Sequence, residues 1–163
     1  PTSHLLKARE HAVHILPSVL NMIQNHSAFF VISCIPHFLQ GKPFMFPIRN
    51  SFDQKIILIA GGYDKKIPYE PLAPEIVAHV KVLVLMGATA PRIEKAVREN
   101  PNFDPQALPI LHADSMQHAV ELARGAAKPG DIVSLSPASA SFDLYPNFEV
   151  RGRDYKRIVN ELQ

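Results

Sequence analysis

The sequence predicts an α/β fold in which a Rossmann-like, mostly parallel sheet is covered by helices on both faces. Short, continuous apolar runs rich in Val, Ile and Leu recur after residue 50. Such runs are typical of parallel strands that are buried on both faces. Segments with helical spacing and helix-capping residues separate them, and this alternation implies parallel strands joined by crossover helices.

The apolar runs and the segments between them define the expected elements. Strands are expected over residues 55–60, 81–86, 109–112 and 131–135. Helices are expected over residues 71–79, 90–99, 115–127 and 152–162. Thr89 is a suitable N-cap for the second helix, and Asp114 with Gln117 has the pattern of a capping box for the third. One basic cluster is expected to form a solvated helix face: Arg151, Arg153, Lys156 and Arg157.

Residues 1–49 differ in composition from the rest of the chain, and we expect an atypical N-terminal segment and linker before a domain of residues 50–163. Residues 5–24 have apolar side chains at helical spacing, although Pro17 would kink or break a helix. Residues 42–47, Lys-Pro-Phe-Met-Phe-Pro, are typical of an extended linker because each proline also restricts the residue before it.

Composition and charge exclude several classes of protein. The net charge of +2 is too small to indicate nucleic acid or an anionic membrane as a partner. The single cysteine, Cys34, excludes a disulfide framework and a cysteine-based zinc site. The longest apolar run, residues 28–35, is too short to span a bilayer and predicts a buried strand. With no signal-peptide pattern at the N-terminus, we expect a cytoplasmic protein.

The loops that follow the expected strands are the places to look for chemistry, because open parallel sheets bind ligands there. After the first strand, residues 61–66 read Gly-Gly-Tyr-Asp-Lys-Lys, which allows close backbone approach and offers an acceptor beside a cation. After the last strand, residues 136–143 offer small hydroxyl side chains and backbone N–H groups to an anion. Solvated turns would explain both loops equally well. Neither a Walker A loop nor the dinucleotide fingerprint occurs.

Two blocks of sequence resemble the C-terminal domain of the Mur ligase family, in the branch that adds D-glutamate. These blocks are residues 58–66, Leu-Ile-Ala-Gly-Gly-Tyr-Asp-Lys-Lys, and residues 135–143, Leu-Ser-Pro-Ala-Ser-Ala-Ser-Phe-Asp, followed by Asn-Phe-Glu-Val-Arg-Gly at 147–152. The resemblance extends over about residues 50–162. It implies an ATP-dependent amide ligase of peptidoglycan synthesis, which phosphorylates the carboxylate of UDP-MurNAc-L-alanine before the amine of D-glutamate attacks. ATP and Mg²⁺ lie mainly on a central domain in this family.

The resemblance also implies roles for individual residues. It assigns four of them to D-glutamate: Ser141, Phe142, Phe148 and Arg92. Relatives have Lys in place of Arg92, and Arg would form a bidentate pair with a carboxylate. Asp64 and Lys65 would lie near the nucleotide at the domain interface. The family's acidic residue can follow the glycine pair directly, where this chain has Tyr63.

The sequence departs from that of a complete Mur ligase. The family's phosphate-binding loop, N-terminal domain and central domain have no counterpart in it. We therefore expect a fragment that binds D-glutamate and is inactive alone. A second reading stays open, in which the chain is a non-enzymatic module that binds a nucleotide or another small ligand on a Rossmann-like fold.

Overall fold

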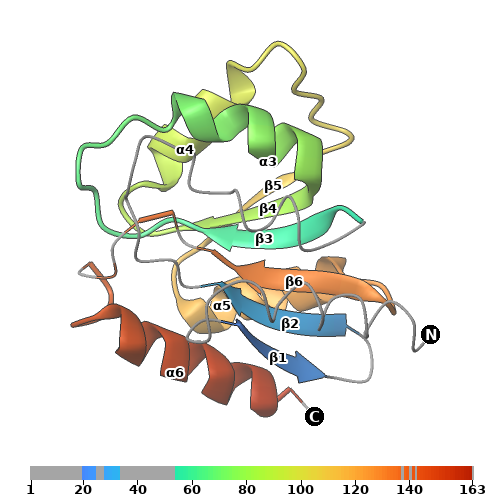
Figure 1. Ribbon diagram of the computed structural model, residues 1–163, viewed down its shortest axis with the longest axis vertical. Helices are drawn as coiled ribbons and strands as arrows, with labels where there is room; N and C mark the ends of the chain where they lie inside the picture. The colour runs from blue at the N-terminus through green and yellow to red at the C-terminus, as the bar shows by residue number, and fades with distance from the viewer. Residues whose placement is uncertain are drawn as a thin grey trace.

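The computed structural model describes residues 54–162 except 137, 140 and 142, together with the backbone of two strands at 20–24 and 28–33. Its six-stranded sheet has the order β1-β2-β6-β3-β4-β5 (Figure 1). The strands are β1 Leu20–Gln24, β2 Ala28–Ser33, β3 Ile56–Ala60, β4 Val80–Met86, β5 Ile110–Ala113 and β6 Asp131–Leu135. The helices are η1 Glu70–Leu72, α3 Ala73–His79, α4 Ala90–Arg98, α5 Met116–Ala126 and α6 Phe148–Asn160.

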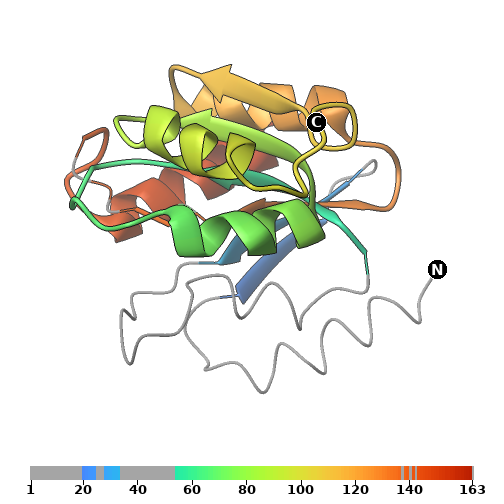
Figure 2. The same ribbon diagram turned by 90° about the horizontal axis from the view of Figure 1, so that it is seen from above.

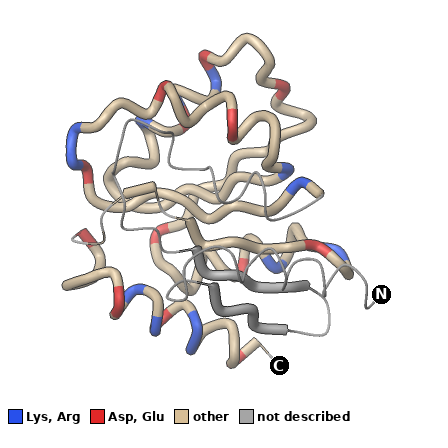
Figure 3. Tube along the Cα trace, in the orientation of Figure 1, with Lys and Arg blue, Asp and Glu red and all other residues tan. Residues whose placement is uncertain are grey.

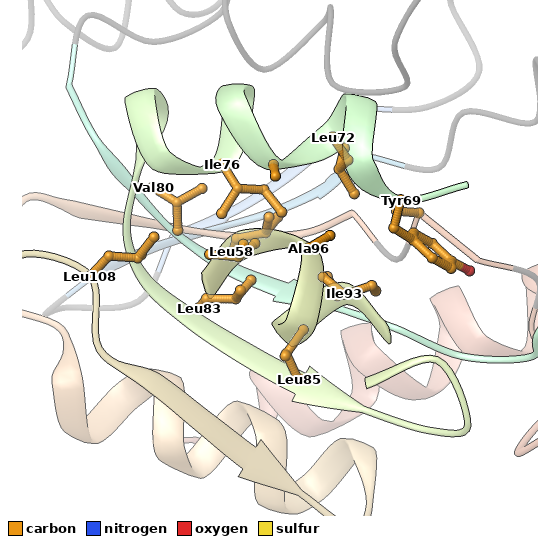
Figure 4. Packing of buried hydrophobic residues seen from close by; sticks show 14 of the residues in the cluster. Leu58, Tyr69, Leu72, Ile76, Val80, Leu83, Leu85, Ile93, Ala96 and Leu108 are labelled. Atoms are coloured by element: carbon orange, nitrogen blue, oxygen red, sulfur yellow. The ribbon is translucent and has the colours of Figure 1, made fainter. Parts of the chain in front are cut away.

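Helices cover both faces of the sheet, as the sequence predicted (Figure 2). Alternate residues of β3 point to opposite faces, so that Ile57 and Ile59 pack with α5 and α6, whereas Leu58 packs with α3 and α4. Figure 4 shows the second of these two cores, in which Ile76 of α3 and Ile93 of α4 lie over the sheet. The apolar side chains in and directly after the last helix are also buried: Tyr155, Ile158, Val159 and Leu162.

Strands β2, β6, β3, β4 and β5 run parallel to one another, and β1 pairs antiparallel with β2. The expected strand over residues 28–35 is therefore confirmed for 28–33. The helical spacing of residues 5–24 is misleading at Leu20–Gln24, because pairing with β2 along the full length of this strand outweighs the local pattern. Both N-terminal strands join the main sheet, and the domain boundary at residue 50 stays a prediction.

The C-terminal elements lie close to their predicted positions, but three details of helix capping differ. Ser115, not Asp114, caps α5, and its hydroxyl accepts a hydrogen bond from the backbone N–H of His118. Helix α6 begins four residues before the expected start, because the side chain of Asn147 accepts from the N–H of Val150. Thr89 precedes α4 without a capping hydrogen bond from its side chain, which contacts a neighbouring loop instead.

Candidate functional site

The loops that follow β3, β4 and β6 meet at one edge of the sheet, on the left in Figure 1. From β3 the chain continues to β4 and β5 on one side, then returns through α5 to β6 on the other side of β3. The strand order thus reverses between β3 and β6, and ligands of open α/β sheets bind at such a reversal. The loop after β3 and the loop after β6 flank this point.

Two hydrogen bonds join the loop after β3 to the loop after β4. The backbone N–H of Thr89 donates to the carbonyl of Gly62 (3.0 Å), and the N–H of Gly62 donates to Thr89 Oγ1 (2.9 Å). Thr89 is completely buried. The hydroxyl that the sequence placed at a helix cap therefore satisfies a backbone group of the neighbouring loop.

Glycine is required where these loops touch. Gly61 has φ +109°, and a Cβ there would overlap the carbonyl oxygen of Met86. Gly87 has φ +75°, and its Cβ would overlap the carboxylate of Asp143 and lie 2.8 Å from the Cα of Gly62. Asp143 Oδ2 also accepts from the N–H of Ala88 (3.2 Å), so the loop after β6 is held against the loop after β4.

Ser139 lies between two other hydroxyl groups. Its Oγ is 3.0 Å from Thr89 Oγ1 and 3.0 Å from the hydroxyl oxygen of Tyr69. Its carbonyl accepts from Nη1 of Arg151 (3.2 Å). Arg151 is buried, so the expected solvated basic face is wrong for this residue, although Arg153 and Arg157 are exposed. Three loops and helix α6 therefore converge on Ser139.

Arg92 is held by contacts within the chain. It donates from Nη1 to Oδ1 of Asp64 (2.5 Å) and from Nη2 to the carbonyl of Ile67 (3.0 Å), and its guanidinium lies 5.2 Å from the ring centroid of Tyr69. The side chain remains 42% exposed. The structure thus brings two of the predicted site residues, Arg92 and Asp64, into direct contact.

Asp64 is held in its ionised form. A hydrogen bond from the backbone N–H of Lys66 (2.7 Å) is the largest cause, and the pair with Arg92 adds to it, so the pKa of Asp64 lies below its ordinary value despite the opposing effect of desolvation. This carboxylate fixes the turn after β3 and the end of Arg92 together. Lys65, next in the chain, is exposed, and Figure 3 shows acidic and basic residues adjacent in this loop.

The other predicted residues lie on the connection between β6 and α6. Ser141 is buried, and its carbonyl accepts from the N–H groups of Leu144 (3.2 Å) and Tyr145 (2.8 Å). Phe148 is the first residue of α6 and is 47% exposed. Phe142 lies outside the described residues. The large hydrophobic residues exposed in the described part of the chain, Tyr63, Leu144 and Phe148, all lie in loops at this edge or directly after one.

Sequence reasoning missed the residues that connect these loops. Tyr69 was not singled out, because its partner Ser139 is 70 positions away in the chain. Tyr145 was also missed; its hydroxyl donates to Oδ2 of Asp154 (2.5 Å), which ties the Ser141 loop to α6. Burial, with the nearby Asp154 carboxylate, raises the pKa of Tyr145, so that its hydroxyl stays a donor. Both contacts depend on how the loops and α6 pack, which a local sequence pattern does not show.

Metal-binding clusters and membrane-spanning helices are both absent from the described residues. These residues contain no group of three or more His, Cys, Asp or Glu side chains that could hold a metal ion. In the same part of the chain, every helix is too short or too polar to cross a membrane.

Comparison with known proteins supports the resemblance found in the sequence. Over 116 residues, 70% of this chain, it is 53% identical to the UDP-N-acetylmuramoylalanine--D-glutamate ligase of Acetivibrio thermocellus. Over 113 residues, 69% of this chain, it is 50% identical to the enzyme of the same name from Clostridium botulinum strain Hall. The match covers 25% of each relative, so the chain spans about a quarter of their length. No family model matches the chain. The predicted resemblance to the D-glutamate-adding Mur ligases is confirmed.

Proposed function

We propose that this chain is the D-glutamate-binding part of an ATP-dependent ligase that joins D-glutamate to UDP-MurNAc-L-alanine in peptidoglycan synthesis. The observation that carries the proposal is the identity of 50–53% with ligases of that name. The position of Arg92 and Ser141 supports it, because both lie in or next to loops at the edge where the strand order reverses. The reaction uses ATP and a nucleotide-linked sugar, so we place it in the cytoplasm.

Arg92 is the proposed partner of the side-chain carboxylate of D-glutamate. A guanidinium has five N–H donors, and the contacts with Asp64 and Ile67 take up two of them. A ligand carboxylate can bind to the others while Asp64 and the Tyr69 ring keep the group in place. Because Arg92 is partly exposed, the ligand reaches it without unfolding the loop.

The loop after β6 is the proposed partner of the other carboxylate. Ser141 offers its hydroxyl, and the N–H of Phe142 lies next in the chain, which together resemble the donor sets that bind anions. The exposed ring of Phe148 would form an apolar wall beside the carbon chain of the ligand. D-glutamate would thus lie between the loop after β6 and the start of α4.

The bond-forming chemistry of the proposed ligase needs parts that the described residues do not supply. ATP would activate the carboxylate of UDP-MurNAc-L-alanine as an acyl phosphate, which makes phosphate the leaving group when the amine attacks. The described residues lack an acidic cluster for a metal ion, so we assign no Mg²⁺ site to them. Domains equivalent to the family's N-terminal and central domains would bind the nucleotide sugar, ATP and Mg²⁺. This chain would orient the amine and help to exclude water.

Asp64 and Lys65 are proposed to face the nucleotide-binding domain. Lys65 is exposed at the edge beside the glycine pair, where its cation can approach a phosphate. The same loop favours the second candidate, a non-enzymatic module for a nucleotide or another small ligand. D-glutamate and ATP as separate ligands distinguish the two candidates.

The test is a titration of the full chain with D-glutamate, followed by NMR. Losing a charge-assisted hydrogen bond costs about 1.5–3 kcal/mol, so Ser141→Ala and Arg92→Ala are expected to weaken binding by roughly ten- to hundredfold. Arg92→Lys keeps the charge and should retain part of the affinity. Arg98→Ala is the matched control, because Arg98 belongs to the same helix but pairs with Glu94 (2.7 Å).

Two results would contradict the proposal. One is a wild-type chain that shows no D-glutamate shifts up to about 50 mM, well above a millimolar dissociation constant. The other is binding that both Ser141→Ala and Arg92→Ala leave undiminished. Shifts with ATP and none with D-glutamate would favour the second candidate.

A further inference from the structure

Tyr69 contacts both halves of the proposed D-glutamate site. Its ring lies under the guanidinium of Arg92, 5.2 Å from the carbon at its centre. Its hydroxyl is 3.0 Å from Oγ of Ser139, two residues before Ser141. Tyr69 is only 3% exposed, so its part in both contacts is shielded from solvent. Among the contacts described for this edge, Tyr69 thus joins Arg92 to the loop that carries Ser141.

Ser139 is fixed from a second direction by Thr89. The two hydroxyl oxygens are 3.0 Å apart, and Thr89 Oγ1 also accepts from the N–H of Gly62. Thr89 lies three residues before Arg92, at the start of α4. The three hydroxyl groups thus form a chain, Tyr69–Ser139–Thr89. Its two ends lie close to Arg92, and its middle member belongs to the loop after β6.

We infer that Tyr69 is a positioning residue, whose hydroxyl sets the placement of Arg92 relative to the Ser141 loop and so sets recognition of the ligand's side-chain carboxylate. This inference rests on the proposed function. The two carboxylates of D-glutamate are separated by a short carbon chain, so their partners must lie at a matching separation. The aromatic ring alone attracts the guanidinium, whereas the hydroxyl ties that ring to Ser139.

Tyr69→Phe isolates the hydroxyl, because it keeps the ring under Arg92. The full chain carrying this change is titrated with D-glutamate and with D-glutamine, whose side chain has the same shape but no charge. One net hydrogen bond corresponds to about a fivefold change in affinity, and we expect that loss for D-glutamate only. The Arg92 Nε resonance should also shift in the absence of ligand. A purely structural role would weaken both ligands alike.

A double-mutant cycle identifies the route of the effect. If Tyr69 acts through Arg92, Tyr69→Phe has no further effect on D-glutamate in the Arg92→Ala background. Ser139→Ala should reproduce Tyr69→Phe, and Arg98→Ala, the matched control on the same helix as Arg92, should bind like wild type. Urea unfolding of each variant separates a loss of fold from a loss of position.

The results fall into two groups. Selective loss of D-glutamate affinity that disappears without Arg92 supports the inference. Unchanged binding in Tyr69→Phe, or equal losses for both ligands, overturns it while wild-type binding still supports the proposed function. Absence of D-glutamate binding in the wild type overturns the proposed function and the inference with it.

Discussion

Three glycines test how closely the loops at the candidate site are packed. A Cβ at Gly125, in α5, or at Gly130 meets no atom within 4 Å, whereas a Cβ at Gly87 overlaps the Asp143 carboxylate and lies 2.8 Å from the Cα of Gly62. Gly125→Ala should stabilise the fold by about 0.5–1 kcal/mol through helix propensity. Gly130→Ala, at φ +89°, should cost about 1–2 kcal/mol for the left-handed backbone alone.

Gly87→Ala combines the cost of a left-handed backbone with that of a steric overlap. Its φ of +75° carries the same backbone cost, and the overlap adds about 1–3 kcal/mol of packing strain, which gives about 2–5 kcal/mol in total. Urea unfolding of the full chain measures all three free energies of unfolding, with equal denaturant slopes as the check on two-state behaviour. If Gly87→Ala is no less stable than Gly130→Ala, the close contact between the loops after β3, β4 and β6 is refuted.

Other predictions concern pH, activity and domain structure. Burial raises the pKa of Glu94, but hydrogen bonds and charge interactions with Arg98 and His112 outweigh this effect, so the pKa lies below its ordinary value. The ionised Glu94 carboxylate therefore stabilises the fold at pH values above its ordinary pKa, and this contribution is lost as the pH falls through the lowered pKa. Glu94→Gln should lower the free energy of unfolding at pH 7, and the difference from wild type should disappear in acid. A difference that does not depend on pH would contradict this. The chain alone should release no phosphate from ATP when UDP-MurNAc-L-alanine, D-glutamate and Mg²⁺ are present, because its sequence has no phosphate-binding loop; measurable release would disprove it. Limited proteolysis should cut first within residues 40–50, and a first cut inside 55–135 would refute the predicted boundary.

Most of the sheet could be predicted because its signal is local. A continuous run such as Ile56–Ala60 can only be buried on both faces, and the glycines that end it mark the turn. Helix α6 was harder to delimit. Gly152 suggested its start, yet the helix begins four residues earlier, at Phe148, because the side chain of Asn147 caps the first turn and a glycine inside a helix is tolerated.

The candidate site was predictable as a set of loops but not as a set of contacts. The carboxyl ends of parallel strands meet at one edge of the sheet, so the sequence alone predicts that Arg92 and Ser141 lie in the same region. Pattern alone did not show that Asp64 pairs with Arg92, or that Thr89 serves Gly62 and not its own helix. Those contacts connect positions 27 or 28 residues apart, and their geometry depends on how two crossover connections pack. The same reasoning explains why buried Arg151 was mistaken for a solvated residue.

The proposed recognition of D-glutamate by this chain predicts that the wild type prefers one enantiomer of glutamate. D- and L-glutamate carry the same charges and groups, so a nonspecific cationic surface binds them equally. Isothermal titration or NMR shifts on the full chain should give a millimolar dissociation constant for D-glutamate, with L-glutamate at least about tenfold weaker, equivalent to 1.4 kcal/mol. Equal affinity for the two enantiomers, or no binding of either, would contradict the proposed recognition of D-glutamate.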